Sequence, residues 1–279
     1  MIELPEARTY ARDLESEILN KKIIDVGGNF TDHKFTFYNE PETYKNKLVG
    51  KKVTAINPRN FYVEIEIEDK ILLFRDGANI RYFHPDEKLP KKSKLLLTFD
   101  DDSKINVTTS MYSMIYVYDK NQLIDNEYYL MELDRIGGLD EAFTFDYFKS
   151  LRDANEKTKK LSGKAFLATE QRILGVGNGV VQDILFCAGV HPKRKINTLD
   201  EPQFKNLYQS VVETLTEMTK DGGRDTEKNL FGECGGYPTI MSKNAYGKHP
   251  CPRCGGPISK ENYLGGSIYY CPICQPLNA

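Results

Sequence analysis

Four cysteines near the end of this 279-residue sequence have the spacing of a metal site. They form two Cys-x-x-Cys pairs, Cys251 with Cys254 and Cys271 with Cys274, and sixteen residues separate the pairs. Such pairs are typical of a site in which four thiolates surround one zinc ion, and four unligated thiols are the alternative. Because four protein ligands leave the metal no open position, we expect one structural Zn²⁺ ion without a catalytic role.

The residues between the cysteine pairs predict a zinc finger built on a β-hairpin. Prolines and glycines beside the cysteines favour the tight turns that bring the backbone around a metal. Between the pairs, residues 258–270 predict a hairpin whose tip consists of Tyr263, Leu264, Gly265 and Gly266.

A glycine-rich corner between two helix-like segments is the second candidate site. Residues 164–171 read KAFLATEQ, and residues 173–192 read ILGVGNGVVQDILFCAGVHP. Gly175 and Gly177 permit a tight turn and the close approach of a backbone or a phosphate, and Asn178 stands at the expected N-cap of the next helix. The N-terminus of a helix offers N–H groups to an anion, so the corner is a candidate phosphate site.

The distribution of charge favours a polyanion as partner of the C-terminal half. The formal net charge is −2, but residues 1–145 carry 26 acidic and 20 basic side chains, whereas the remainder carries 14 acidic and 18 basic ones. Residues 155–195 alone carry eight basic and three acidic side chains. This local excess suits a nucleic-acid backbone. The alternative is a helical hairpin with a solvated basic face.

The pattern of apolar residues changes from β-rich to helical along the chain. Pro5 and apolar residues spaced by three and four up to Ile18 predict a first helix. Alternation in FYVEIEI places Val63 and Glu64 on opposite faces of a strand. The other predicted strands are KFTFY, KILLF, KLLLTF and KINVTT, and the later predicted helices are residues 145–151, 163–168, 179–188 and 203–218.

Length and composition indicate a water-soluble α+β chain with two domains. Hydrophobic residues make up 40% and charged residues 28%, and no apolar run approaches the roughly 20 residues of a membrane span. Charges interrupt the N-terminal segment, so we expect no secretory signal, a cytoplasmic protein and no membrane partner. The predicted parts are a β-sandwich domain at 1–130, a linker at 131–148, a helical domain at 149–235 and the finger at 236–279.

Three segments together resemble the Fpg/Nei family of base-excision DNA glycosylases. The sequence ELPE at residues 3–6 resembles the family's N-terminal signature, residues 164–192 its helix-two-turn-helix motif, and residues 251–274 its zinc finger. They occur in the family's order across essentially the whole chain, whereas the β-rich middle matches only in pattern. The resemblance implies an N-terminal β-sandwich with flanking helices, a C-terminal helix-two-turn-helix domain with a zinc finger, and DNA between them.

The resemblance also implies which residues would contact DNA. Lys164 and Asn178 would hold phosphates near the lesion, with Gly177 in the same corner. Residues 75–79 lie where the family places a side chain that fills the void in the duplex, and Ala78 would fill little, so Arg81 becomes a candidate contact. The implied partner is double-stranded DNA, damaged or abasic, and we expect a DNA-associated monomer.

The position that carries the family's chemistry differs in this chain. In the family, the N-terminal proline exposed by removal of methionine attacks the sugar C1′ of a flipped-out nucleotide. The matching residue here is Ile2, whose bulk normally prevents removal of Met1, so the reactive amine is displaced by one residue. Glu3 matches the carboxylate that assists proton transfer in the family, although a glutamate in a first helical turn is also a routine partner of the helix dipole.

Two further positions lack a positive charge that the family uses at phosphates. The family's β-hairpin lysine aligns with Asn60, and its finger-tip arginine aligns with Gly266. Each lost phosphate clamp removes a charge-assisted hydrogen bond worth about 1.5–3 kcal/mol.

These observations leave three hypotheses for the function. The first is a protein of the family that recognises damaged DNA with altered or lost catalysis. The second is an active DNA glycosylase and abasic-site lyase that uses another N-terminal amine, such as that of Met1, because an α-amine with a reference pKa near 7.7–8.0 is partly neutral at physiological pH. The third is a structural or RNA-binding protein on the same basic scaffold.

Overall fold

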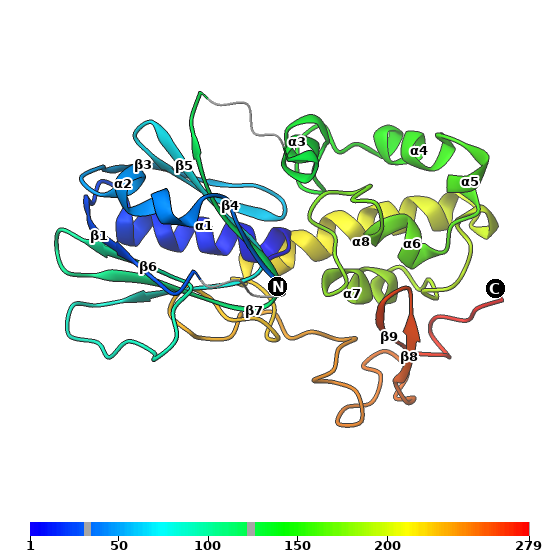
Figure 1. Ribbon diagram of the computed structural model, residues 1–279. Helices are drawn as coiled ribbons and strands as arrows, with labels where there is room; N and C mark the ends of the chain where they lie inside the picture. The colour runs from blue at the N-terminus through cyan, green and yellow to red at the C-terminus, as the bar shows by residue number, and fades with distance from the viewer. Residues whose placement is uncertain (31–34, 122–125, 279) are drawn as a thin grey trace. The chain divides into compact units, whose positions relative to one another are not determined.

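The chain folds into two structural units, as the computed structural model in Figure 1 shows for residues 1–30, 35–121 and 126–278. The first unit contains Met1–Leu133 and Gly222–Gly235, and the second contains Asp134–Asp221 and Gly236–Ala279. The α+β class with two domains is therefore confirmed. The segment 222–235, grouped with the helical domain in the sequence prediction, packs in the structure with the N-terminal unit.

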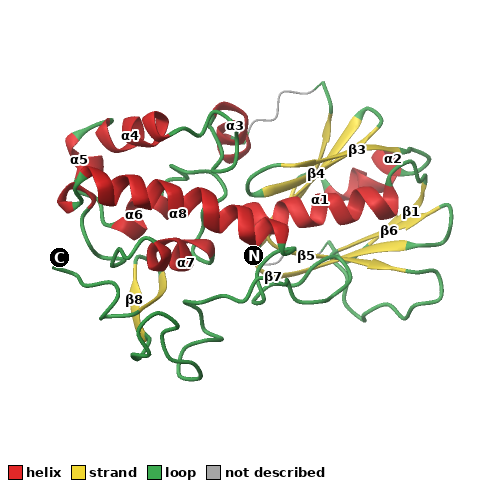
Figure 2. Cartoon of the chain, turned by 180° about the vertical axis from the view of Figure 1, so that it is seen from behind, coloured by secondary structure: helices red, strands yellow, loops and turns green. Residues whose placement is uncertain are grey.

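The first unit is built on a seven-stranded sheet in which β2 pairs parallel to β7 and the other pairs are antiparallel. The neighbour order is β1–β6–β7–β5–β4–β3. Figures 1 and 2 show the β3–β4 end and the β1–β6 end of this sheet as two layers. The strands are β1 (Ile23–Gly27), β2 (Thr36–Tyr38), β3 (Val53–Pro58), β4 (Tyr62–Ile67), β5 (Lys70–Phe83), β6 (Leu95–Phe99) and β7 (Lys104–Asp119).

The two longest strands, β5 and β7, connect the layers and contain the largest irregularity of the sheet. The first half of β5 pairs with β4, and the first half of β7 pairs with β6. Between the pairs Asp76↔Ser113 and Ala78↔Thr109, one residue of β5 faces three residues of β7. Residues 110–112 therefore form a bulge, which bends the strand and changes the direction of its side chains.

Helix α1 (Leu4–Ile18) forms as the sequence predicts, and its apolar side packs into the core of the first unit. Pro5 occupies the first turn, and Glu3 and Glu6 form a capping box that satisfies N–H groups at the start of the helix. The buried residues of the predicted stripe are Ala7, Tyr10, Ala11, Leu14 and Ile18.

Short helices complete the first unit and cover part of the sheet. They are the 3₁₀ turn η1 (Pro41–Thr43), α2 (Tyr44–Leu48) and α3 (Glu127–Asp134). Most residues on both faces of β4 are buried, and Tyr129 of α3 packs edge to face against Tyr62 and donates to Glu64. Glu64 is only 2% exposed and accepts hydrogen bonds from the Tyr129 hydroxyl at 2.7 Å and from Arg59 at 3.3 Å.

A buried arginine joins the returning segment 222–235 to the start of α1. Arg224 is 2% exposed, and its guanidinium donates to the two carboxylate oxygens of Glu6 at 2.9 and 2.7 Å. It also lies 3.7 Å from a carboxylate oxygen of Glu3, which is fully buried. Because both carboxylates are removed from water, the guanidinium is the charge that offsets them.

The second unit is helical and ends in a two-stranded hairpin. Its long helix α8 begins at a capping box between Asp200 and Gln203, and the predicted apolar stripe from Phe204 to Met218 is buried. Its elements are α4 (Phe145–Asp153), α5 (Glu156–Lys159), α6 (Gly163–Ala168), α7 (Val180–Cys187), η2 (Ile196–Thr198), α8 (Glu201–Lys220), β8 (Ser259–Tyr263) and β9 (Gly266–Tyr270). Within the described parts of the chain, no helix has the length and apolar character needed to span a membrane.

Removing the buried guanidinium should destabilise the first unit strongly. We expect Arg224→Ala to lower the free energy of unfolding by about 3–5 kcal/mol, because Glu3 and Glu6 would remain buried without a cation. Chemical denaturation measures the change. Lys45→Ala is the control, since Lys45 pairs with Asp25 while both side chains are more than half exposed, and its loss should cost no more than about 1 kcal/mol. Equal losses for the two variants would contradict the assignment.

Candidate nucleic-acid interface and metal centre

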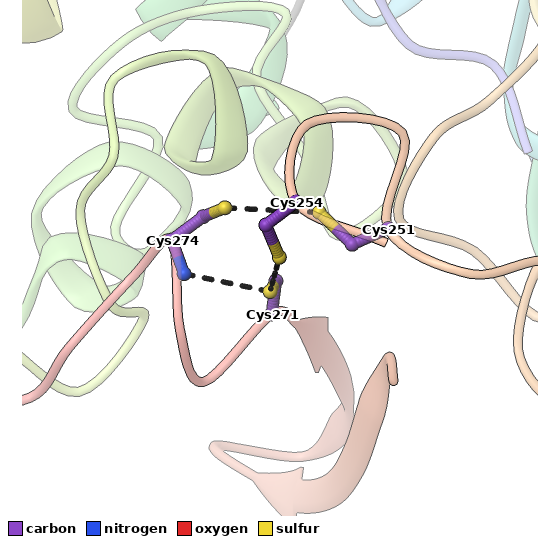
Figure 3. Close-up of side chains that lie close together, drawn as sticks. All are labelled: Cys251, Cys254, Cys271 and Cys274. Carbon is purple, nitrogen blue, oxygen red and sulfur yellow. Dashed lines mark hydrogen bonds between the residues drawn. The ribbon is translucent and has the colours of Figure 1, made fainter. Parts of the chain in front are cut away.

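The structure brings the four predicted cysteine ligands together (Figure 3). Their sulfur atoms all lie within 4.8 Å of one another. The Sγ atoms of Cys251 and Cys274 are 3.8 Å apart, and those of Cys254 and Cys271 are 3.5 Å apart. A tetrahedron of thiolates with metal–sulfur bonds of about 2.3 Å has sulfur–sulfur edges of about 3.8 Å. The cluster therefore has the dimensions of a four-thiolate metal centre.

Backbone N–H groups point at two of these sulfur atoms. The Gly256 N–H donates to Cys254 Sγ and the Cys274 N–H donates to Cys271 Sγ, each at 3.4 Å. The Gly256 contact is the main reason why the pKa of Cys254 falls to about 7. Gln275 fixes the second pair to the helical domain, because its side chain accepts from the Cys271 N–H and donates to the Val190 carbonyl.

The predicted finger hairpin forms and is anchored by Lys164. Strands β8 and β9 pair from Ser259↔Tyr270 to Tyr263↔Gly266, so the turn falls at the predicted tip. Lys164 Nζ donates to the Tyr263 carbonyl at 2.7 Å, and the Tyr263 hydroxyl donates to Ser162 at 3.0 Å. Lys164 is 1% exposed, and burial lowers its pKa. Its structural contact is with the finger, and the predicted phosphate contact stays a prediction.

Gln182 on α7 makes a second connection to the same hairpin. Its side-chain amide donates to the Ser267 carbonyl at 3.1 Å and to the Asn178 carbonyl at 3.0 Å, and its oxygen accepts from the Tyr269 N–H at 3.1 Å. The residue lies inside the segment that the sequence singled out, but helical periodicity gave no sign that it faces the finger. Together, Gln182 and Lys164 fix the turn against the glycine-rich corner.

Asn178, Lys164 and the finger turn meet at Gly266. A Cβ atom added to Gly266 would lie 3.6 Å from Asn178 Oδ1 and 3.6 Å from Lys164 Nζ. Asn178 itself is exposed. The predicted N-cap was wrong by one residue, because Gly179 occupies that position and α7 has no side-chain cap. The tight turn depends on Gly175, whose φ is +83°, whereas Gly177 contributes its carbonyl to Val181 at the start of α7.

The predicted catalytic residues lie together at the start of α1 in the first unit. The Met1 α-ammonium pairs with the Glu227 carboxylate, and Met1 is 41% exposed. Ile2 is 1% exposed and belongs to the hydrophobic core, and its backbone N–H donates to the Asp76 carbonyl at 2.8 Å. Burial raises the pKa of Asp76, although the charges of Arg75 and of the Met1 amine oppose this effect. Glu3 faces Arg224 in the buried network.

Internal partners fix Asn60, which replaces the family's lysine, and Arg81, the candidate DNA contact. Asn60 donates to the Glu132 carboxylate from its backbone at 3.0 Å and from its side chain at 3.1 Å. Arg81 donates to the Ile80 carbonyl at 2.8 Å, to the Asn229 carbonyl and to the Tyr10 hydroxyl. These contacts account for the placement of both side chains, and a DNA contact by Arg81 stays a prediction.

Family models match both units of the chain. Residues 1–110 match the formamidopyrimidine-DNA glycosylase N-terminal domain, and residues 136–229 match the formamidopyrimidine-DNA glycosylase H2TH domain. The chain belongs to the formamidopyrimidine-DNA glycosylase family. The resemblance found in the sequence is thereby confirmed, and both matched domains lie in the order expected for this family.

Relatives within the family align over nearly the full length of the chain. The formamidopyrimidine-DNA glycosylase of Lactococcus lactis subsp. lactis is 29% identical over 281 residues, which cover 99% of each chain. That of Bacillus cereus is 28% identical over 287 residues, again with 99% of each chain covered.

Solved structures of the family show the same fold. A complex of the Lactococcus lactis protein with DNA that contains N7-benzyl-Fapy-dG has a TM-score of 0.81 at 26% identity, covering 98% of this chain and 99% of that one. A complex of the same protein with abasic-site DNA has a TM-score of 0.80 at the same identity and coverage. The Thermus thermophilus protein matches in fold with a TM-score of 0.78, at 23% identity and with 98% of each chain covered.

Loss of one cysteine ligand should release both the metal and the finger. We expect purified protein to contain one tightly bound metal ion per chain and Cys271→Ser to contain much less, because a hydroxyl is a poorer ligand than a thiolate. Elemental analysis by mass spectrometry measures the content. Cys234→Ser is the control, because Cys234 is an exposed cysteine outside the cluster. Metal-free wild type, or equal metal content in both variants, would contradict the assignment.

Proposed function

We propose that this protein recognises damaged or abasic double-stranded DNA and that its ancestral glycosylase chemistry is altered or lost. The proposal rests on the bonding of the Ile2 nitrogen and on the burial of the Ile2 side chain. Its nitrogen is a peptide amide, hydrogen-bonded to the Asp76 carbonyl, and its side chain is buried in the core. An amide nitrogen has no basic lone pair, so it cannot attack a sugar carbon as a free amine does.

The second unit supports the DNA-binding part of the proposal. The turn of the finger lies against the exposed Asn178 and is held by the buried Lys164, so two separate chain segments meet at one surface. The second unit also contains the basic stretch from 155 to 195. Relatives of the same fold carry damaged or abasic DNA in their solved complexes. A surface of this kind binds the sugar-phosphate backbone, and its affinity should fall as salt is added.

The metal that we propose for the finger is zinc in a structural role. Four thiolates in a tetrahedral arrangement favour zinc over ions that prefer oxygen ligands. Cys251 and Cys271 are buried within the small core beneath the hairpin. The metal would then hold the base of the hairpin while Lys164 and Gln182 hold its turn.

The second candidate function is abasic-site cleavage by the Met1 α-amine. Two observations favour it: Met1 is 41% exposed, and its amine pairs with Glu227. A carboxylate beside an amine can accept a proton, and a neutral amine can form a Schiff base with the open-chain sugar of an abasic site.

Borohydride trapping on a duplex with one abasic site separates the two candidates. Reduction converts a Schiff base between the protein and the sugar into a stable covalent adduct. We expect no adduct with the wild-type protein, because the nitrogen of residue 2 is an amide. Ile2→Pro should form the adduct once Met1 has been removed, because it then presents a free secondary amine. Denaturing electrophoresis measures the adduct, and peptide mass spectrometry locates it.

Two outcomes of the trapping experiment would change the assignment. An adduct on Met1 of the wild-type protein would establish the second candidate. An adduct on another amine of the protein, such as a lysine side chain, would overturn the proposed loss of chemistry if that adduct formed at a catalytic rate. Duplex binding by Ile2→Pro, measured in parallel, shows whether that variant is folded.

Restoring a charge at the tip of the finger should strengthen DNA binding. A Cβ atom fits at Gly266, because it meets its neighbours at 3.6 Å, an ordinary contact distance. Gly266→Arg should therefore tighten binding to abasic duplex by about tenfold or more, since a charge-assisted hydrogen bond to phosphate contributes about 1.5–3 kcal/mol. Fluorescence anisotropy measures the affinity. Gly266→Gln is the uncharged control, and equal affinity of both variants would argue against a phosphate at this turn.

A further inference from the structure

A buried guanidinium stands beside Glu3, the predicted proton-transfer residue of the first unit. Glu3 is fully buried, and one of its carboxylate oxygens lies 3.7 Å from Nη1 of Arg224. Two further interactions act on the same carboxylate: it accepts the Glu6 N–H in the capping box, and it lies at the positive N-terminal end of α1. All three interactions favour the ionised form of Glu3.

Glu6 binds the same guanidinium and fixes its orientation. Arg224 donates from Nε and Nη2 to the two carboxylate oxygens of Glu6 at 2.9 and 2.7 Å, and its backbone N–H donates to Glu6 at 3.2 Å. Two parallel hydrogen bonds leave a planar guanidinium little freedom, so Nη1 stays beside Glu3. Burial alone would lower the pKa of Arg224, but the charges of Glu3 and Glu6 raise it above its ordinary value. The guanidinium is therefore charged.

A turn of glycines places Arg224 against the start of α1. Gly222 and Gly223 have φ values of +74° and +92°, in the left-handed region that favours glycine. Gly235 packs on this turn, because a Cβ atom there would lie only 2.2 Å from the carbonyl oxygen of Gly223. The position of Arg224 is thus determined by the backbone of the returning segment as well as by its two carboxylate partners.

Release of a base from an intact nucleotide by an amine requires a proton donor near the sugar. When the amine attacks C1′, the bond from C1′ to the base breaks, and the base takes the bonding electrons and the proton of the amine. A cationic imine forms only when the bond between C1′ and the ring oxygen O4′ also breaks and O4′ takes a proton from an acid. An ionised carboxylate has no proton to give.

An abasic site does not require an acid at O4′. Part of this sugar is present as an open-chain aldehyde, in which the bond between C1′ and O4′ is already broken. An amine adds to the aldehyde carbon, and the former carbonyl oxygen leaves as water with one proton from the amine and one from solvent. An intact damaged nucleotide and an abasic site therefore report separately on the acid and on the amine.

We propose that Arg224 keeps Glu3 ionised and thereby removes the proton donor that base release from an intact nucleotide requires. Arg224 touches no reacting atom and acts through Glu3. The inference deepens the proposed function, on which it rests, because it assigns the loss of chemistry to two separate changes. One is the missing free amine at Ile2, and the other is the permanent charge of Glu3. Restoring the amine alone then restores imine formation at an abasic site but not release of a damaged base.

Release of free base from a duplex with one formamidopyrimidine lesion tests the proposal. We expect Ile2→Pro to form the borohydride adduct with abasic duplex and to release no formamidopyrimidine. Ile2→Pro/Arg224→Gln should release it about a hundredfold faster or more, because Glu3 takes up a proton when it is buried without a cation, and a positioned acid contributes about that factor. Liquid chromatography with mass spectrometry measures the free base. A purely structural role of Arg224 would lower the rate in this variant.

Arg224→Lys is the matched control, because it retains the positive charge at the same position. Ile2→Pro/Arg224→Lys should release no more formamidopyrimidine than Ile2→Pro does. Equal gains for the glutamine and lysine variants would mean that the charge of residue 224 is not the cause, and this would overturn the proposal. Thermal unfolding of both variants measures how much stability each replacement costs.

The pH dependence of base release provides a second test of the glutamine variant. Its rate should fall on the alkaline side, because a proton donor acts only in its protonated form. A rate that does not fall there would contradict the role of Glu3. The other titratable groups around Glu3 and residue 224, which the glutamine and lysine variants share, are Tyr10, Glu6, Asp76, Glu227 and the N-terminal amine.

Carbon-13 NMR of the wild-type protein decides the proposal even if the glutamine variant does not fold. Glutamate labelled at its side-chain carboxyl carbon reports ionisation, and the resonance that is absent from Glu3→Gln belongs to Glu3. We expect this resonance to keep the chemical shift of a carboxylate from about pH 5 to pH 8. A protonated Glu3 in this range would overturn the proposal, because the two carboxylates would then share one proton as well as one guanidinium.

The outcomes separate this inference from the proposed function. Base release or an adduct with the wild-type protein contradicts the proposed function. Base release by Ile2→Pro alone contradicts only this inference, because Glu3 would then still donate a proton beside Arg224. Failure of Ile2→Pro/Arg224→Gln to release the base, although it forms the adduct with abasic duplex, would overturn this inference as well.

Discussion

The candidate interface in the second unit depends on the attachment of the finger turn to the glycine-rich corner. The turn is held by the Lys164 ammonium at the Tyr263 carbonyl and by the Gln182 amide, while four thiolates fix the base of the hairpin. A lysine that is 1% exposed is costly unless it finds a partner, so the hydrogen bond to Tyr263 makes the docked position the favourable one. The corner and the finger then present their polar groups together.

The start of the chain is organised by a separate network of buried charges. The scaffold around residue 2 is intact: Glu3 caps α1, Arg224 neutralises the buried carboxylates, and Asp76 receives the N–H of Ile2. In the proposed function, the position of the nucleophile is taken by Ile2, whose side chain contributes to the core. Such a replacement is compatible with the family's fold, since fold and chemistry depend on different residues.

Local patterns in the sequence predicted α1, α4, α6, α7 and α8, most strands, the finger hairpin and its four cysteines, because short spacings determine each of them, whereas α2, α3 and α5 were missed. Contacts between distant segments could not be predicted. Examples are Lys164 with Tyr263, Glu64 with Tyr129 and Arg224 with Glu6, which are separated by 99, 65 and 218 residues.

The position of Arg224 has a consequence for how the chain is made. The carboxylates of Glu3 and Glu6 leave the ribosome first, yet the guanidinium that offsets their burial follows more than 200 residues later. Before Arg224 is synthesised, packing of the first helix against its strands would bury two carboxylates without a counter-charge. In the nascent chain, that helix should therefore stay exposed to solvent. Completion of the N-terminal unit is thus delayed until most of the protein has been synthesised, which places a non-local step late in folding.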